Sequence, residues 1–160
     1  MVPTIYLETS IISYLAAQPS RDLITAARQQ LTHEWWDRRR NSFQLFVSEL
    51  VLVEISRGDA EASARRLAWL DGIEAVDTSP LAEEIADHIL RHAGLPQHAR
   101  ADALHIAIAA SQGIDYLMTW NATHIANALI RPRVERVCRS LGFEPPVLCT
   151  PDELMAGEEP

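Results

Sequence analysis

Short runs of apolar residues alternate along the chain with longer stretches whose apolar positions recur at helical spacing. The short runs are rich in β-branched and aromatic side chains, which favours buried strands, and they cover residues 2–7, 43–47, 74–76, 116–118 and 147–149. The longer stretches predict helices over residues 20–40, 48–57, 60–71, 79–93, 100–112 and 132–141, and a short last helix from Thr150. Such alternation predicts the α/β class, as a three-layer α/β/α domain around a mainly parallel central sheet.

Glycine positions agree with this division into elements. Five of the six glycines directly follow predicted helices, where a residue with positive φ commonly ends a helix; they are Gly58, Gly72, Gly94, Gly113 and Gly142. We expect a single domain over residues 1–155 and a frayed C-terminal tail over residues 156–160.

The stretch from residue 100 to residue 127 contains the first two candidate site residues and indicates where the others should lie. Its helix, residues 100–112, is alanine-rich and apolar nearly all round, so we expect it to be buried. Asp102 lies in the first turn of this helix, and Asn121 follows the strand at residues 116–118. Ligands of open parallel sheets bind at the carboxyl ends of the strands. We therefore asked which other polar residues of the chain converge on that edge.

The amino-acid composition excludes several classes of protein. The net charge of −8 argues against a protein that coats nucleic acid by bulk electrostatics. All 14 basic residues are arginine, and the missing lysine excludes a P-loop NTPase, a Schiff-base enzyme, a protein kinase and a response-regulator receiver. No apolar run is long enough to span a membrane and no signal peptide is evident. Cys138 and Cys149 lack zinc or redox spacing, which favours reduced thiols in a cytoplasmic protein.

Four polar residues stand where apolar neighbours predict burial at the carboxyl edge: Glu8, Glu54, Asp102 and Asn121. Buried carboxylates are normally paired or bound to a metal ion, and three close together would repel one another unless a cation offset their charge. Oxygen ligands suit Mg²⁺ or Mn²⁺ better than zinc. This set predicts metal-assisted attack of water on a phosphodiester.

Each of the four also has a purely structural interpretation. Asp102 could complement the dipole of its helix, Glu8 could pair with an arginine, and Glu54 could lie on an exposed helix face. Asn121 could be an ordinary turn or cap residue. The functional hypothesis therefore depends on their joint placement.

Further candidates have similar alternatives. His105 and His124 each lie three residues after a predicted site residue and are candidate substrate contacts. His105 could also be a core histidine whose ring nitrogens are hydrogen-bonded within the protein. Tryptophans could pack in the core or a dimer interface or could stack bases; they are Trp35, Trp36 and Trp69. Arginines could bind nucleic-acid phosphate or an acidic segment of a partner protein, or could be solvated; they are Arg38, Arg39, Arg40, Arg131, Arg133, Arg136 and Arg139.

Four segments together resemble the PIN domain, and within it the VapC-type toxins of bacterial type II toxin–antitoxin pairs. They are IYLETS, SELVLVEISRG, ADALHIAIA and LMTWN, and the resemblance spans residues 5–151. It implies an Mg²⁺- or Mn²⁺-dependent endoribonuclease with Glu8, Glu54, Asp102 and Asn121 as catalytic metal ligands. Ser10 and Thr119 would support them through hydroxyl groups. The first and fourth positions are commonly aspartate in the family, whereas this chain has Glu8 and Asn121.

The resemblance also implies an RNA substrate, an antitoxin partner, frequent homodimers and no membrane association. A competing hypothesis is a catalytically weak PIN-fold protein that acts by binding RNA or a partner. An unrelated nucleotide-binding α/β module is disfavoured, because the chain lacks a glycine-rich phosphate loop as well as lysine.

Overall fold

A computed structural model describes residues 1–155 and contains one five-stranded, fully parallel sheet in the order β3-β2-β1-β4-β5. The strands are β1 (Thr4–Leu7), β2 (Gln44–Ser48), β3 (Glu74–Val76), β4 (Tyr116–Met118) and β5 (Val147–Cys149). The central register aligns Ile5 of β1 with Leu45 of β2 and with Tyr116 of β4.

Helices fill the connections between the strands. The α-helices are α1 (Thr9–Ala16), α2 (Leu23–Arg39), α3 (Glu49–Ile55), α4 (Ala60–Ala68), α5 (Pro80–His92), α6 (Arg100–Ser111) and α7 (Arg131–Ser140). Short 3-10 helices are η1 (Arg40–Ser42), η2 (Gln97–Ala99) and η3 (Pro151–Leu154).

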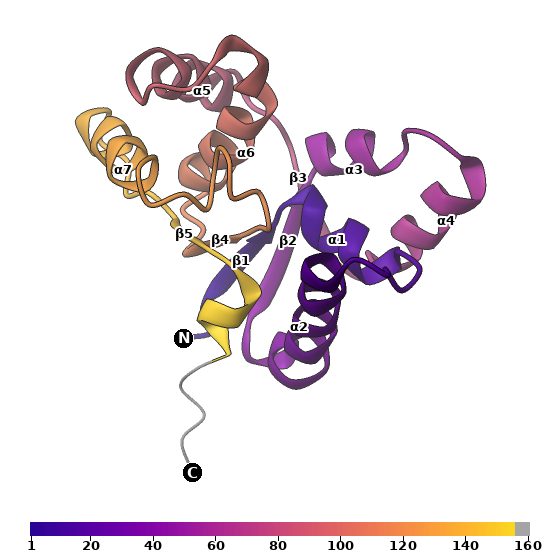
Figure 1. Cartoon of the computed structure of the whole chain (residues 1–160). Coiled ribbons are helices and arrows are strands. Elements are labelled where there is room, and N and C mark those ends of the chain that lie inside the picture. Colours follow the sequence, from indigo (N-terminus) through magenta and orange to yellow (C-terminus); the bar gives the residue numbers. More distant parts are fainter. Residues whose placement is uncertain (156–160) are drawn as a thin grey trace.

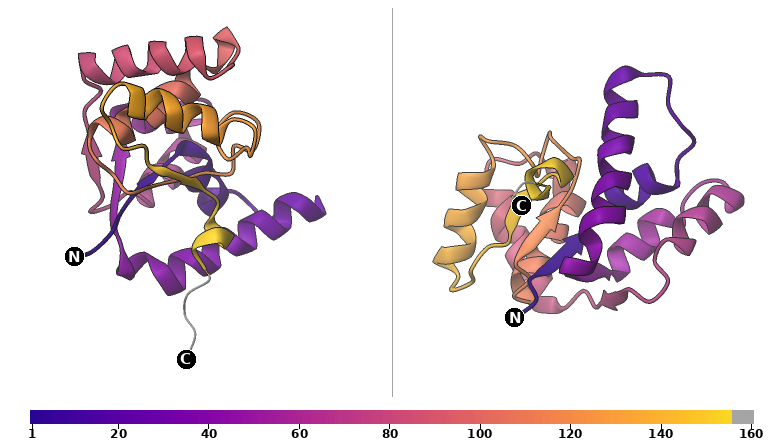
Figure 2. Two further views of the ribbon diagram at one scale, coloured as in Figure 1. Left: turned by 90° about the vertical axis from the view of Figure 1, so that its left-hand side faces the viewer. Right: turned by 90° about the horizontal axis from the view of Figure 1, so that it is seen from below.

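The order of the strands places the helices on two faces of the sheet. From β1 the chain moves outward through β2 to the edge strand β3, then returns to pair β4 with the other side of β1 before ending at β5. Parallel crossovers are almost always right-handed, so reversing direction moves the helices to the opposite face. Helices α1 to α4 accordingly cover one face and α5 to α7 the other (Figures 1 and 2). The expected three-layer α/β/α architecture is confirmed.

The core is centred on β1 and α6. Ile5, Tyr6 and Leu7 of β1 are fully buried, as expected for a central parallel strand covered on both faces. Helix α6 is buried along most of its length, which confirms the interpretation of its apolar sequence. It ends with Gly113 at φ 68°, a left-handed conformation that costs glycine little.

The structure corrects the sequence-based description near the N-terminus. Residues 9–16 were not expected to be helical, yet they form α1, whose buried side chains are Ile11, Ile12 and Leu15. Helix α2 begins at Leu23 rather than at residue 20, and its N-cap is Asp22, which accepts a hydrogen bond from the Thr25 amide. The start of this helix is not buried, since Leu23 is 85% exposed, whereas Trp35 near its end is fully buried. The last predicted helix is the 3-10 turn η3.

Two expectations concern the chain as a whole. Within residues 1–155 no helix is both long and apolar enough to cross a membrane. The tail predicted over residues 156–160 lies outside the described residues.

Candidate active site at the carboxyl edge of the sheet

Strand β1 is the point where the strand order reverses, because β2 pairs with one side of it and β4 with the other. In open α/β sheets a ligand crevice forms at such a switch point, beyond the carboxyl ends of the strands. Glu8 follows the last residue of β1, and Thr119 follows the last residue of β4. Two of the residues singled out from sequence therefore flank the topological switch point.

Glu8 is held at this point as the N-cap of α1. Its backbone is extended, and its Oε1 accepts hydrogen bonds from the Ser10 amide at 3.1 Å and the Ser10 hydroxyl at 2.5 Å. The Thr119 hydroxyl donates to the same oxygen at 2.6 Å. Glu8 is only 6% exposed. No arginine among residues 1–155 forms an ion pair with it, so hydroxyl and amide donors hold this carboxylate in place.

The same two hydroxyls join the loop after β4 to the start of α1. The Ser10 hydroxyl accepts from the Trp120 amide at 2.8 Å, and the Thr119 hydroxyl accepts from the Asn121 amide at 2.9 Å. The side chain of Asn121 turns back onto its own loop, where its Oδ1 accepts from the amides of Thr123 and His124. This is the turn-capping contact that its structural interpretation anticipated.

Glu54 reaches the edge from α3. Its Oε1 accepts from the Thr9 hydroxyl at 2.7 Å and lies 2.5 Å from Nε2 of His105, a buried residue of α6. Burial opposes ionisation of this half-buried carboxyl, but its close contact with His105 and the hydrogen bond from Thr9 outweigh burial and lower the pKa of Glu54 below its ordinary value. Glu54 is therefore ionised at neutral pH and connects the two helical layers across the sheet edge.

Two buried hydroxyl residues that were not predicted to be functional continue this contact into the core. Nδ1 of His105 lies 2.6 Å from the Tyr6 hydroxyl, which lies 2.7 Å from the Ser48 hydroxyl. Burial raises the pKa of Tyr6 above its usual range, and the charges of Glu8 and Glu54 raise it further. The charges of both carboxylates thus act on the same phenol. A polar aromatic inside the apolar run TIYL was the available sequence signal.

Asp102 occupies the first turn of α6, as predicted, and is half-buried. Its Oδ2 lies 2.8 Å from Nδ1 of His124, whose ring makes an edge contact with the ring of His98 at 5.5 Å. His105 follows Asp102 by three residues on the same helix and contacts Glu54. Both histidines that were candidate substrate contacts are therefore bonded to candidate acids, His105 to Glu54 and His124 to Asp102.

The donor chemistry of these carboxylates fits a hard divalent cation. Each acid uses one oxygen for its protein contacts, and the other has no hydrogen bond to any described residue; these are Oε2 of Glu8, Oε2 of Glu54 and Oδ1 of Asp102. Carboxylate oxygens with free lone pairs are what Mg²⁺ or Mn²⁺ requires. Within residues 1–155, however, no three Asp, Glu, His or Cys side chains are clustered closely enough to form a ready metal site.

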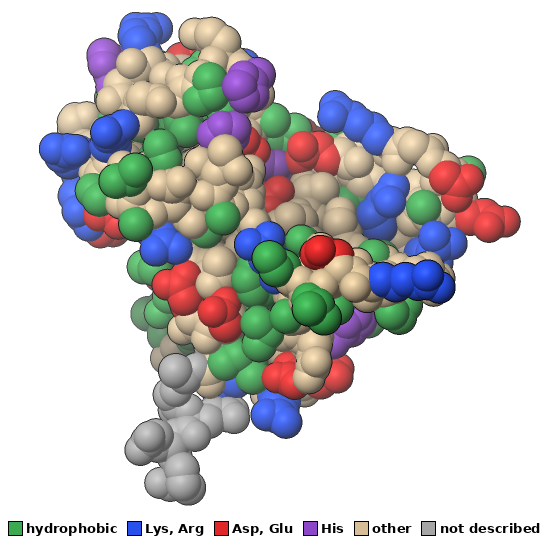
Figure 3. Space-filling view, viewed as in Figure 1, with side chains coloured by type: hydrophobic (Ala, Val, Ile, Leu, Met, Phe, Trp, Pro, Cys, Tyr) green, Lys and Arg blue, Asp and Glu red, His purple; other side chains and the backbone are tan. Residues whose placement is uncertain are grey.

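The space-filling view shows the setting of this edge. Acidic and histidine side chains lie in a hollow between the part of the molecule formed by α5, α6 and α7 and the part formed by α3 and α4, and arginines lie at its margins (Figure 3). Arg28 of α2 is half-buried, and its guanidinium lies 5.4 Å from the ring centre of Trp120. It forms no ion pair with the described residues. A cation therefore stands beside the loop that carries Thr119.

The remaining arginine and tryptophan candidates are mainly engaged in contacts within the protein. Arg40 stacks on Trp36 at 4.4 Å, and Arg131 pairs with Glu153. Trp35 is fully buried and Trp36 nearly so, while Trp69 packs edge-on against Trp36. The interpretation of the tryptophans as packing residues is confirmed by their burial and ring contacts.

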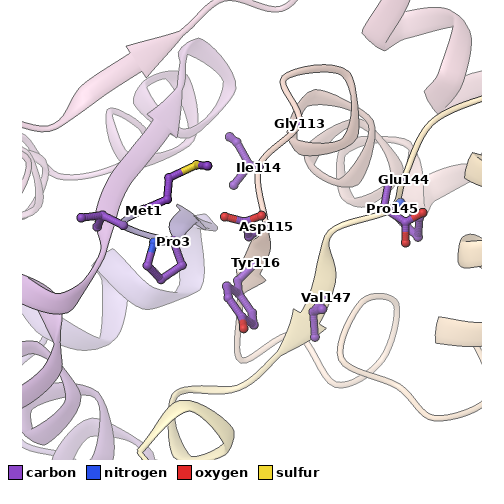
Figure 4. A pocket seen from close by; sticks show the side chains of 10 residues that line it. Met1, Pro3, Gly113, Ile114, Asp115, Tyr116, Glu144, Pro145 and Val147 are labelled. Atoms are coloured by element: carbon purple, nitrogen blue, oxygen red, sulfur yellow. The ribbon is translucent and has the colours of Figure 1, made fainter.

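A separate hollow of about 560 Å³ lies at the opposite, amino-terminal edge of the sheet. Figure 4 shows Asp115, Tyr116, Glu144 and Val147 among the residues that line it. Asp115 accepts hydrogen bonds from the amide and hydroxyl of Thr4, and the acid at the rim, Glu144, pairs with Arg139. The acids of this hollow are thus committed to structural contacts, and none belongs to the predicted site.

This fold, with carboxylates from separate segments at the switch point of a parallel sheet, defines a class of α/β proteins that includes metal-dependent nucleases. The PIN domain family model matches residues 5–128, and the protein therefore belongs to the PIN domain family. A comparison of the sequence with curated proteins finds no match.

Solved structures share the fold at low sequence identity. VapC20 of Mycobacterium tuberculosis, a toxin that cleaves the sarcin–ricin loop, is 18% identical with a TM-score of 0.59 over 88% of this chain and 96% of its own. VapBC2 of Rickettsia felis, bound to a promoter DNA fragment, is 18% identical with a TM-score of 0.56 over 75% of this chain and 89% of its own. FitAB, bound to a DNA fragment, is 16% identical with a TM-score of 0.56 over 92% of this chain and 95% of its own.

Proposed function

We propose that this PIN-domain protein is a metal-dependent endoribonuclease that hydrolyses RNA phosphodiester bonds in the cytoplasm, as the toxin of a type II toxin–antitoxin pair. One observation carries the proposal. Carboxylates from three separate segments, Glu8, Glu54 and Asp102, lie at the carboxyl edge of one sheet, and each has an oxygen with no hydrogen bond to a described residue. An Mg²⁺ or Mn²⁺ ion held by these oxygens would offset their charge.

We assign a separate role to each residue of the proposed site. Glu8, Glu54 and Asp102 would hold the ion, and Asn121 would occupy the fourth position of the set without adding charge. Ser10 and Thr119 fix the orientation of Glu8 through the hydrogen bonds that they donate to it. When bound, the ion lowers the pKa of a water molecule and stabilises charge on the phosphate. The half-buried His124, held against Asp102, stands where it can contact the substrate.

Arginine gives the site a means of binding an anionic chain. Arg28 is oriented by Trp120, and the Trp120 amide is hydrogen-bonded to Ser10, the neighbour of the first acid. A guanidinium in this position can bind a phosphate with paired hydrogen bonds. We propose that the RNA backbone passes Arg28 of α2 beside the loop that follows β4.

Two structural relatives provide the basis for proposing a partner. VapBC2 and FitAB are toxin–antitoxin complexes whose structures contain DNA. We propose that this chain likewise binds an antitoxin protein and forms a homodimer. Neither partner is needed for the first test of activity.

The test is cleavage of a labelled single-stranded RNA by the purified protein, with and without added Mg²⁺ or Mn²⁺. We expect Asp102→Asn to lower the rate at least ~100-fold, because it removes one charge from the ion's ligands, whereas Glu84→Gln should match the wild type. Glu84 is an exposed acid of α5 whose side chain has no hydrogen bond to the described residues, so its variant makes the same charge change away from the site.

A substrate with 2′-O-methyl groups separates this activity from contamination. Hydrolysis by a metal-activated water does not need the 2′-hydroxyl, whereas ordinary contaminating ribonucleases use it as the nucleophile. Metal-dependent cleavage of the modified RNA that disappears in Asp102→Asn would support the proposal. Equal rates for Asp102→Asn and Glu84→Gln would remove Asp102 from the mechanism.

The alternative function is a catalytically weak PIN-fold module that binds RNA or a protein partner. It is favoured by the side chain of Asn121, which is committed to capping a turn, and by the absence of a ready three-ligand cluster within residues 1–155. A titration with Mn²⁺ distinguishes the two functions. A binding module would show no Mn²⁺ affinity that depends on Glu8 or Asp102, while its RNA affinity would survive Asp102→Asn.

A further inference from the structure

A buried chain of hydrogen bonds runs from β2 to Glu54, and no part of it is needed to form the strands. Its members are Ser48, Tyr6 and His105, which are at most 1% exposed, and it ends on Oε1 of the half-buried Glu54. We propose that these three residues form a positioning array that fixes the ring of His105 as one neutral tautomer, with its hydrogen on Nε2, and thereby fixes the carboxylate of Glu54. The role of Glu54 as a metal ligand rests on the proposed function.

The direction of the array follows from counting donors and acceptors. The Ser48 hydroxyl accepts from the Val51 amide at 3.3 Å as the N-cap of α3, which leaves its own hydrogen to donate to the Tyr6 oxygen. The Tyr6 hydroxyl then donates to Nδ1 of His105, and Nε2–H donates to the carboxylate of Glu54. When the hydrogen bonds run in this direction, every buried donor hydrogen of the array has an acceptor.

The opposite direction leaves a buried donor unsatisfied. If Nδ1 carried the hydrogen, it would donate to Tyr6, and the Tyr6 hydroxyl would have to donate to Ser48. The Ser48 oxygen would then accept from both Tyr6 and Val51, while its own hydrogen would have no acceptor among the described residues. An unsatisfied buried hydroxyl costs about 1–3 kcal/mol. The hydrogen-bond geometry thus selects the Nε2–H tautomer.

This selection has a consequence for Glu54. Its Oε1 receives two hydrogen bonds, from His105 and from the Thr9 hydroxyl, so that oxygen is saturated and the side chain is held in one orientation. Its Oε2 has no hydrogen bond to the described residues and keeps its lone pairs. The partners of a metal-binding carboxylate orient it and tune its basicity. Tyr6 and Ser48 therefore act on the site through His105.

The first test needs neither metal nor substrate. Nitrogen-15 chemical shifts of the His105 ring, measured by NMR on the metal-free full chain at neutral pH, report which nitrogen carries the hydrogen. We expect the Nε2–H tautomer in the wild type and a mixture of tautomers in Tyr6→Phe, which keeps the ring but removes the donor. Tyr116→Phe is the matched control, because Tyr116 packs on Phe43 at the start of β4 and its hydroxyl has no hydrogen bond to a described residue.

An Nδ1–H or doubly protonated His105 in the wild type would overturn the proposal without recourse to any variant. So would an unchanged tautomer in a folded Tyr6→Phe protein. These outcomes are independent of whether the protein cleaves RNA, so the array and the proposed nuclease function can fail separately.

The second test measures Mn²⁺ affinity by calorimetry, apart from turnover. His105→Leu removes the donor to Glu54 and should weaken Mn²⁺ binding about 10–100-fold, the usual effect of losing a partner of a metal ligand. His105→Gln keeps an amide N–H near the position of Nε2 and should restore most of that affinity. If His105→Leu and His105→Gln bind Mn²⁺ as tightly as the wild type, His105 does not position Glu54 for a metal ion and the proposal falls.

Discussion

The contact between Thr119 and Glu8 joins the two strand ends at the switch point, and removing it is expected to destabilise the fold measurably. Thr119→Val keeps the shape of a fully buried side chain and deletes only the hydroxyl. That hydroxyl donates to Oε1 of Glu8 at 2.6 Å and accepts from the Asn121 amide at 2.9 Å. The substitution therefore weakens the hold on Glu8 and frees one amide of the following loop.

The magnitude follows from these two bonds. A hydrogen bond to a charged group contributes about 1.5–3 kcal/mol, and the half-exposed Asn121 amide can recover part of its loss from water. We expect Thr119→Val to lower the free energy of unfolding by about 2–3 kcal/mol in total. For a chain of this size, each kcal/mol lowers Tm by roughly 2–4 °C, so the expected shift is roughly 4–12 °C.

Urea denaturation of the wild type, Thr119→Val, Glu8→Met and the double variant measures this effect and its origin. If the energy lies in the contact, the double-mutant cycle gives a coupling of about 1–3 kcal/mol. Thr123→Val is the control, since Thr123 is exposed and its hydroxyl has no hydrogen bond to the described residues. Its expected change is within about 0.5 kcal/mol.

Two results would refute this reasoning. Thr119→Val could lose no more stability than Thr123→Val, in which case the hydroxyl contributes nothing to the fold. Alternatively, the losses in Thr119→Val and Glu8→Met could add without coupling, so that their stabilising contacts would be separate from each other.

Two further predictions concern titratable groups. Because the pKa of Glu54 is lower in the folded protein than in the unfolded chain, its ionised form stabilises the fold above an ordinary carboxyl pKa near ~4.3, and this contribution is lost as pH falls through the lower folded value. Urea stability should thus decline less steeply with falling pH in Glu54→Gln than in wild type, whereas a parallel decline would contradict the assignment. Burial raises the pKa of Cys138 to about 11 and that of Cys149 to about 12. Neither thiol should react with a disulfide reagent at neutral pH until urea unfolds the chain; rapid labelling of the folded protein would disagree with their burial.

The strands and most helices could be predicted because their signals are local. The all-apolar sequence of α6 required burial on every side, and the helices predicted to begin at Ser48 and Ser79 have these residues as their N-caps. Helix α1 was missed because the polar residues after β1 indicated only the end of a strand. The same residues also start a helix, because Glu8 is its N-cap. The helical spacing of Ile11 and Leu15, which form its buried face, was the signal for this helix in the sequence.

The site could be predicted only as a set of residues at one edge. Sequence order indicated that Glu8, Asp102 and Asn121 follow strands or begin a buried helix, and the carboxyl ends of parallel strands meet at the same edge. It gave no indication that Glu54 would contact His105 across the sheet or that Tyr6 and Ser48 would extend this contact. These pairs come from residues between 42 and 99 positions apart in the chain.

The sequence by itself determined the α/β class, the burial of β1 and α6, and the presence of isolated acids within apolar segments. These features depend on side-chain type and periodicity, which act over a few residues. The tertiary structure alone decided which oxygen of each acid is bonded, which histidine faces which carboxylate, and that Asn121 caps a turn. Hydrogen bonds require their atoms within about 3.5 Å and in the right direction, and only the packing of the sheet between its two helical layers brings distant residues so close.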